Sequence, residues 1–168
     1  EPKKREELKK RIEEDERILH SMEALETAVD VETAGAPRSA YLIVPSEKEE
    51  LDRYIHLQNR ETREAYHLDE EGVVITEKLA RLLDVSEGDV IVLKEDDTRQ
   101  AEARVSHITE QYFMHYVYMS QELYEQLYGT EPDWNQWFLK NEQQGEELED
   151  ALRTEYIQLS AVSDVEFI

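Results

Sequence analysis

The sequence predicts an α+β domain in which the two ends of the chain form a mixed sheet-and-helix layer that holds a mostly β insert. Two observations support this class. Strand-like and helix-like segments alternate near both ends, and strand patterns fill the middle, where only two short helical segments interrupt them. Such elements are stable when each packs its apolar face against another layer. We expect the outer layer over residues 1–36 and 130–168 and the insert over residues 37–129.

A first helix is predicted over residues 1–25, because apolar residues recur there at roughly helical spacing. Pro2 suits the first turn of a helix, where its missing N–H costs nothing. Glu7 and Arg11 lie four residues apart with the acid leading, which supports a solvated outer face. Residues 27–33 then alternate and are rich in β-branched side chains, which predicts a strand.

The next segment, AYLIV at residues 40–44, predicts a buried strand that ends at Pro45. Ser46 and Glu49 have the spacing of a capping box, so a short helix is expected over residues 47–53. Residues 54–68 are expected to form a hairpin or two short strands around a polar turn.

The run EEGVVITEKLARLLDVSEGDVIVLKEDD, Glu70 to Asp97, is the clearest module of the chain. It predicts a buried strand, a helix from Glu77 to Leu83 capped by Thr76, a tight turn at Gly88 and a second strand. We interpret this unit as framework. The residues predicted to serve structural turns, rather than a site, are Gly72, Gly88, Asp89 and Gly129.

The rest of the chain predicts further strands and helices in alternation. The expected elements are a strand over 101–109, a strand over 111–120, a helix over 121–128 that Ser120 caps and Gly129 ends, a strand near 135–140, a helix over 145–156 and a strand over 158–168. Alternation along the second of these strands places Tyr112, Met114, Tyr116 and Tyr118 on one face. The candidate contacts with a partner protein are Tyr116, Tyr118, Trp134 and Trp137.

Composition excludes several classes of function. Forty-one acidic and nineteen basic residues give a net charge of −22, which repels the phosphates of nucleic acid and of an anionic membrane surface. The chain has no cysteine, so it has neither disulfides nor thiol chemistry. No apolar run approaches the roughly 20 residues that a membrane-spanning helix needs.

No motif in the sequence predicts catalysis or a cofactor. The histidines do not have zinc-ligand spacing, and the acidic tracts lack the EF-hand pattern of calcium-binding loops. Neither a nucleophile elbow nor a glycine-rich phosphate loop is present. We expect that the chain is not an enzyme and that this domain holds no cofactor and no metal.

With these motifs in place, the chain resembles a known family. The run Glu70 to Asp97, followed by ARVSHITEQYFMHYVYMSQELYEQLYG, is similar to the large extracytoplasmic domain of FtsX/MacB-like ABC transporter permeases, most of all to Gram-positive members. The likeness extends back through AYLIVPSEKEELDRYIHLQNRET and covers nearly the whole chain. Its motifs are specific in combination.

The resemblance implies an extracellular domain between two membrane-spanning helices of a bacterial permease located in the cell membrane. The chain ends would form a porter-like layer, and the domain would couple membrane movements to substrate or partner binding, a form of mechanotransmission. ATP would bind a separate ATPase subunit. The implied partners are that ATPase, a second permease copy or half, and an extracellular protein or peptide, with no nucleic acid.

Two residues depart from the pattern of this family. Asp84 and Met114 each stand where relatives commonly carry glycine, so the turn into Val85 and the backbone approach before His115 are expected to differ.

Two alternatives stay open at the level of sequence. One is a free-standing acidic protein-interaction module built on a strand–helix–GD–strand barrel unit, as in swapped-hairpin or double-psi barrels of DNA-binding regulators, although the charge disfavours DNA. The other is an acidic hydrolase, which would require carboxylates with perturbed pKa values in a cleft.

Overall fold

The computed structural model describes residues 2–111, 114–141, 145–159, 162 and 164–165. The chain packs into two compact units, one of Glu1–Ser21 with Leu139–Ile168 and one of Met22–Phe138. The sequence analysis predicted the boundaries between the two parts after residues 36 and 129 instead. The difference at the first boundary arises because residues 24–31 pair with residues 38–45, which draws residues 22–36 into the larger unit.

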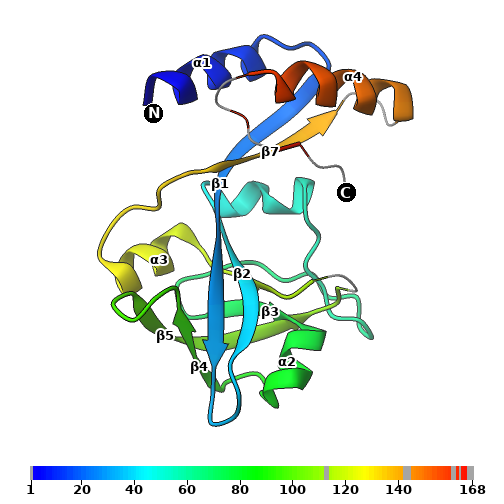
Figure 1. Ribbon diagram of the computed structural model, residues 1–168. Coiled ribbons are helices and arrows are strands. Elements are labelled where there is room, and N and C mark those ends of the chain that lie inside the picture. The colour runs from blue at the N-terminus through cyan, green and yellow to red at the C-terminus, as the bar shows by residue number, and fades with distance from the viewer. Residues whose placement is uncertain (1, 112–113, 142–144, 160–161, 163, 166–168) are drawn as a thin grey trace. The chain divides into compact units, whose positions relative to one another are not determined.

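The chain combines helices with a mixed sheet, which confirms the predicted α+β class (Figure 1). In chain order they are α1 (Pro2–Glu13), β1 (Ile18–Glu32), β2 (Arg38–Pro45), the 3₁₀ helix η1 (Lys48–Arg53), β3 (Val73–Thr76), α2 (Glu77–Leu83), β4 (Val90–Lys94), β5 (Gln100–Thr109), β6 (Tyr116–Tyr118), α3 (Gln121–Tyr128), β7 (Gln136–Asn141) and α4 (Glu146–Ile157).

Six strands of the larger unit close into a barrel. Their order is β2-β6-β3-β5-β4-β1, and β1 pairs back with β2 to complete the ring, while β7 joins β1 as a seventh strand. The β2–β6 and β3–β5 pairs are parallel, and the other four pairs of the ring are antiparallel. Closure satisfies the strand edges that an open sheet would expose.

Apolar side chains on the two faces of the barrel wall form two separate clusters. The larger cluster joins all six strands to the apolar faces of α2 and α3, with Leu42 and Val117 among its fully buried members. The next residues along the same strands, Ile43 and Tyr118, point the other way, because side chains alternate along a strand. They pack with η1 and the 56–68 segment in the second cluster.

The predicted first helix is wrong beyond Glu13. The helix ends there, and the Asp15 side chain accepts hydrogen bonds from the backbone N–H and the guanidinium of Arg17, which turns the chain into β1. Met22 and Leu25, counted as helix positions from their spacing, are buried in a strand. Pairing of β1 with β7, and with β2 from Ala24 onward, overrides the local helical periodicity.

Most other elements lie where the sequence predicts them, but two caps do not form as expected. Ser120 caps α3 by accepting a hydrogen bond from the Leu123 N–H at 3.1 Å, and this prediction is confirmed. Thr76 occupies the N-cap of α2 without a side-chain cap bond, and the N-cap of η1 is Glu47, not Ser46.

Three further expectations need adjustment. Among the described residues of the expected strand over 111–120, only Tyr116–Tyr118 form a strand, and Tyr112 and Phe113 lie outside the described residues. The hairpin at 54–68 is reduced to an isolated bridge between Gln58 and Ala65. Of the predicted last strand, residues 158, 159, 162, 164 and 165 form no strand, and its other positions lie outside the described residues.

Candidate functional site

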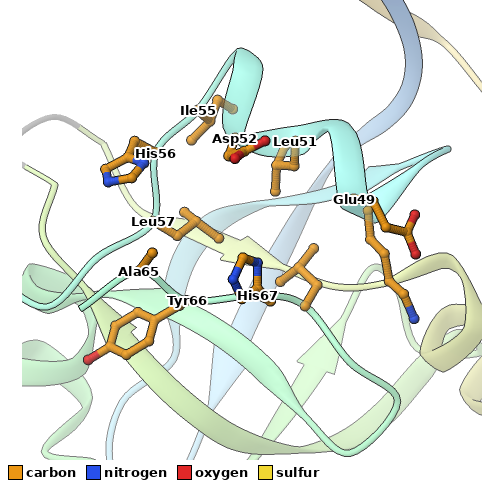
Figure 2. A pocket seen from close by; sticks show the side chains of 11 residues that line it. Glu49, Leu51, Asp52, Ile55, His56, Leu57, Ala65, Tyr66 and His67 are labelled. Atoms are coloured by element: carbon orange, nitrogen blue, oxygen red, sulfur yellow. The ribbon is translucent and has the colours of Figure 1, made fainter.

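A small pocket lies between η1 and the 56–68 segment (Figure 2). Asp52 from η1 and His56, Tyr66 and His67 from the following segment line it together with apolar side chains. Its volume is about 30 Å³, which accommodates roughly one or two water molecules. A pocket of this size is not a chamber for a transported molecule.

His107 and His115, the histidines of two successive predicted strands, are separated in the fold. His107 lies on β5 and His115 precedes β6, and β3 lies between these two strands. His107 stacks on the Tyr66 ring, with the ring centroids 4.2 Å apart. Across the described ranges, no group of three or more histidines and carboxylates is arranged to hold a metal ion. In the same ranges, no helix combines the length and apolar character that crossing a bilayer requires.

A charged cluster in the smaller unit joins α1, the turn into β1 and α4. Arg17 binds Asp15 with two hydrogen bonds, from Nε to Oδ1 at 2.9 Å and from Nη2 to Oδ2 at 2.7 Å. It also binds both carboxylate oxygens of Glu155 on α4. The Tyr156 hydroxyl donates to Asp15 Oδ2 at 2.9 Å, and the Arg11 guanidinium lies 5.4 Å from the centre of the Tyr156 ring.

Burial makes this cluster more than a surface ion pair. The Asp15 side chain is only 4% exposed, so its charge depends on these partners. The hydrogen bonds from Arg17 hold the pKa of the Asp15 carboxyl at about 2, against the opposing effect of burial. Burial and the bond to Asp15 raise the pKa of the Tyr156 hydroxyl. The cluster stays ionised near neutral pH and fixes α1 to α4.

Sequence reasoning missed this cluster. Asp15 and Arg17 fell inside the predicted first helix, and Glu155 lies 138 residues further along the chain. The one available signal is the acid-rich stretch EEDER at residues 13–17, which in an acidic chain cannot be told from a solvated surface.

The four candidate contact residues differ in exposure. Tyr118 is fully buried and its hydroxyl donates to Gln111 Oε1 at 2.8 Å, so its prediction as a partner contact is wrong. Strand alternation there turns Tyr118 toward the second cluster. Tyr116 is half-buried and its ring lies 6.2 Å from that of Tyr41. Trp134 packs partly against the larger cluster, Trp137 is half-buried on β7, and both stay predictions as contacts.

The predicted turn residues of the GD module bind it to β5. The Gly88 N–H donates to the Val105 carbonyl at 2.7 Å, and the Val105 N–H donates to the Asp89 carbonyl at 2.8 Å. The Asp89 carboxylate accepts from the Ser86 N–H at 2.8 Å. Gly88 and Gly129 both have positive φ, 94° and 73°, which favours glycine at each position.

Gly72 is required because of close packing against β5 and not because the chain turns there. A Cβ atom added there would lie 2.2 Å from Ser106 Oγ and 2.4 Å from the Arg104 carbonyl oxygen of β5. The pairing of β3 with β5 shifts register between Val73 and Val74, immediately after this close approach. Gly72 therefore lets the backbones of two strands approach closely next to this register shift.

The two residues that depart from the family pattern share one backbone feature. Asp84 has φ 56° at the C-cap of α2, and Met114 has φ 57° just before β6. Both conformations lie in the left-handed region, where a glycine would be unstrained. In this chain both positions carry a side chain, and that of Met114 is exposed.

Comparison with known proteins gives matches in structure alone. No protein-family model and no curated protein matches the sequence. The extracellular domain of the noncanonic ABC-type transporter YknZ from Gram-positive bacteria superposes with a TM-score of 0.54 and 11% identity, over 88% of this chain and 77% of that one. The periplasmic region of MacB from Actinobacillus actinomycetemcomitans superposes with a TM-score of 0.50 and 12% identity, over 92% and 73%.

At these identities the likeness is one of fold. The chain has the α+β fold of the extracytoplasmic domains of YknZ and MacB, and the resemblance to FtsX/MacB-like permease domains that the sequence suggested is confirmed at that level.

Proposed function

We propose that the chain is a non-catalytic extracytoplasmic domain of an ABC transporter permease, which couples conformational change in the membrane to binding of a substrate or partner outside it. The observation that carries the proposal is the fold, which both solved transporter domains share over most of this chain. Two further observations agree with it: a strongly acidic chain and an ionic tie between the helices nearest the chain ends.

The proposed mechanism depends on the charged cluster. When one helix moves, a second helix moves by the same amount only if the two are rigidly attached to each other. Arg17 holds Asp15, at the turn after α1, and Glu155, on α4. A membrane helix attached ahead of α1 would therefore move α4 with it, and the resulting tilt would shift the population of partner-bound states.

The partners follow from this role. ATP would be bound and hydrolysed by a separate ATPase subunit, and a second permease copy or half would complete the transporter. An extracellular protein or peptide would meet the exposed surface of the domain. Nucleic acid is disfavoured by the net charge of −22.

The coding sequence on both sides of this chain tests the proposal. We expect an apolar segment of about 20 residues on each side, long enough to span a bilayer. Maleimide labelling of single cysteines in whole cells would then place the domain outside, since the chain itself has no cysteine. An initiator methionine just before Glu1 and a stop codon just after Ile168 would contradict it.

That second outcome would favour the free-standing interaction module. The closed six-stranded barrel with its GD turn hydrogen-bonded to β5 is the observation that supports this candidate. Its acidic surface would then serve binding of a basic partner, and loss of that binding at high salt would be its test.

A further inference from the structure

A buried apolar patch lies on the face of the barrel wall opposite the larger cluster. Its members are side by side on three neighbouring strands, because Ile43 of β2 pairs with Tyr118 of β6, and Tyr118 pairs with Val74 of β3. Each of these three side chains is at most 3% exposed. All three belong to the second cluster, so a segment outside the barrel wall covers them.

The cover includes residues 54–68, which we call the strap. Its Leu57 and Leu68 are buried in the second cluster. The structure describes the whole strap, and none of it belongs to a strand of the sheet; its β-bridge joins Gln58 to Ala65 within the strap itself. A small pocket also remains between the strap and η1 (Figure 2). The strap therefore covers the patch without joining the barrel.

The contacts that hold the strap gather at the end of β5, around Glu110. The Gln58 N–H donates to Thr109 Oγ1 at 3.0 Å, and the Glu110 N–H donates to the Gln58 carbonyl at 2.9 Å. The Glu110 side chain is 10% exposed and accepts from Arg63 Nη1 at 3.2 Å. It also accepts from Gln58 Nε2 at 3.1 Å and lies 3.8 Å from Arg60 Nη1. One carboxylate thus binds three side chains of the strap.

The tip of the strap is strained where it meets this carboxylate. Arg63 has a φ of 63°, a left-handed conformation that a residue with a Cβ atom adopts at a cost. Strained residues persist where surrounding contacts hold them, and one such contact here is the ion pair with Glu110. Loss of the Glu110 contacts would therefore release strain in the tip as well as the strap.

We propose that the strap is a gate, which Glu110 holds closed and which opens as one unit to uncover the apolar patch while the barrel stays folded. The ring of six strands closes without the strap, and the two clusters are separate among the described residues, so opening leaves the larger cluster packed. Segments with few backbone bonds to the core open at lower free energy than core strands do. While it is closed, the strap blocks access to the patch, which is an autoinhibitory arrangement.

Thiol labelling tests the proposal, because the chain has no cysteine of its own. Val73 and Val74 are buried neighbours on β3, but Val73 belongs to the larger cluster and Val74 to the second cluster beneath the strap. In single-cysteine variants of the two positions, N-ethylmaleimide reaches a thiol only after opening. We expect Val74→Cys to react about 100-fold faster than Val73→Cys without denaturant.

The free energy of unfolding of each variant, from urea denaturation, gives the labelling rate that unfolding of the whole domain would allow. A rate for Val74→Cys no higher than this limit, or no higher than the rate for Val73→Cys, would overturn the proposal.

A second substitution tests the role of Glu110. Glu110→Gln keeps the size of the side chain and removes the charge that binds the arginines of the strap. It should speed labelling of Val74→Cys about tenfold and leave Val73→Cys unchanged. The matched control is Glu102→Gln, at an exposed carboxylate on the same strand. The proposal fails if Glu110→Gln speeds both thiols equally or neither, or if Glu102→Gln has the same effect.

Native-state hydrogen exchange gives a readout in the unmodified chain. The amides of Gln58 and Glu110 form the hydrogen bonds between strap and β5, whereas the Met119 N–H donates to the Ile43 carbonyl at 3.0 Å within the barrel wall. Relative to intrinsic rates, we expect the first two to exchange about 100-fold faster than Met119 and with one shared urea dependence. Exchange of all three through a single global unfolding would contradict the gate. Neither experiment needs a transporter, so both can fail while the proposed coupling function stands.

Discussion

Gly72 is the residue at which the fold tolerates a side chain least. The Arg104 carbonyl that a Cβ would meet belongs to the backbone of β5, so it cannot move aside as a side chain would. Gly72→Ala is expected to lower the free energy of unfolding by about 1–3 kcal/mol. Urea denaturation measures this loss. Gly35→Ala is the matched control, because nothing lies within 4 Å of a Cβ at that position, and a loss of equal size there would contradict the explanation.

Asp84 presents the opposite case, a position where glycine is expected to stabilise. Its φ of 56° lies in the left-handed region, which costs a residue with a Cβ about 1–2 kcal/mol. Because glycine also loses more entropy on folding, Asp84→Gly should raise the free energy of unfolding by about 0.5–1 kcal/mol. Asp52→Gly, within η1, should lower it. A loss of stability in both variants would contradict the role of backbone strain.

These residues show how far sequence could predict the framework. Gly88 and Gly129 were identified because a turn after a strand or a helix needs local conformations that glycine provides. The reason for Gly72 lies about 30 residues away on β5, so no local pattern reveals it. Tyr118 was misassigned because alternation along a strand separates two faces but does not tell which face is covered.

At the scale of elements, the two predicted serine caps make a direct comparison. Ser120 is buried, accepts from the Leu123 N–H at 3.1 Å and donates to the Asp69 carbonyl at 2.8 Å. Ser120→Ala should therefore cost about 1–2 kcal/mol. Ser46→Ala should cost less than about 0.5 kcal/mol, because Ser46 caps no helix. Equal effects, measured by urea denaturation, would contradict the assignment.

The charged cluster predicts how the smaller unit responds to acid. The pKa of Asp15 is about 2 in the folded chain against an ordinary 3.8, so its stabilisation is fully present above about pH 4 and is lost as the pH falls through about 2. The shift corresponds to about 2 kcal/mol. Asp15→Asn should lose this amount at pH 7 and flatten the stability curve between about pH 4 and pH 2.

The control for this titration is Asp52→Asn, at an exposed carboxylate on η1. It should leave both the stability at pH 7 and its decline in acid close to those of the parent chain. Urea denaturation at a series of pH values, followed by circular dichroism, gives both quantities. A curve for Asp15→Asn that parallels the parent curve would contradict the role of the cluster.

The elements also show where local pattern fails. Residues 18–25 have helical spacing of apolar side chains, yet they belong to β1, because this strand pairs with β7 and, from Ala24 onward, with β2. The module from β3 to β4 was predicted correctly since its strand, helix, GD turn and strand are each specified by neighbours in sequence. Barrel closure itself depends on pairings such as β2 with β6, across about 75 residues, which no local signal encodes.

At the scale of the whole molecule, the central claim is that this domain carries movement from the membrane to a partner outside. In the proposed permease, the Asp15–Arg17–Glu155 tie makes α1 and α4 move together. Because the chain lacks cysteine, a single introduced cysteine reports on one position alone. Lys10, exposed on α1, and Glu61, exposed between β2 and β3, suit this purpose.

The most direct measurement is crosslinking of Lys10→Cys and Glu61→Cys in membranes that contain the full transporter, once without nucleotide and once with ATP trapped. The account predicts a different pattern of crosslinks to neighbouring chains in the two states. It also predicts that adding Glu155→Gln, which weakens the tie to Arg17, reduces the difference. Identical patterns in the two nucleotide states would contradict the claim that this domain couples transport to events outside the cell.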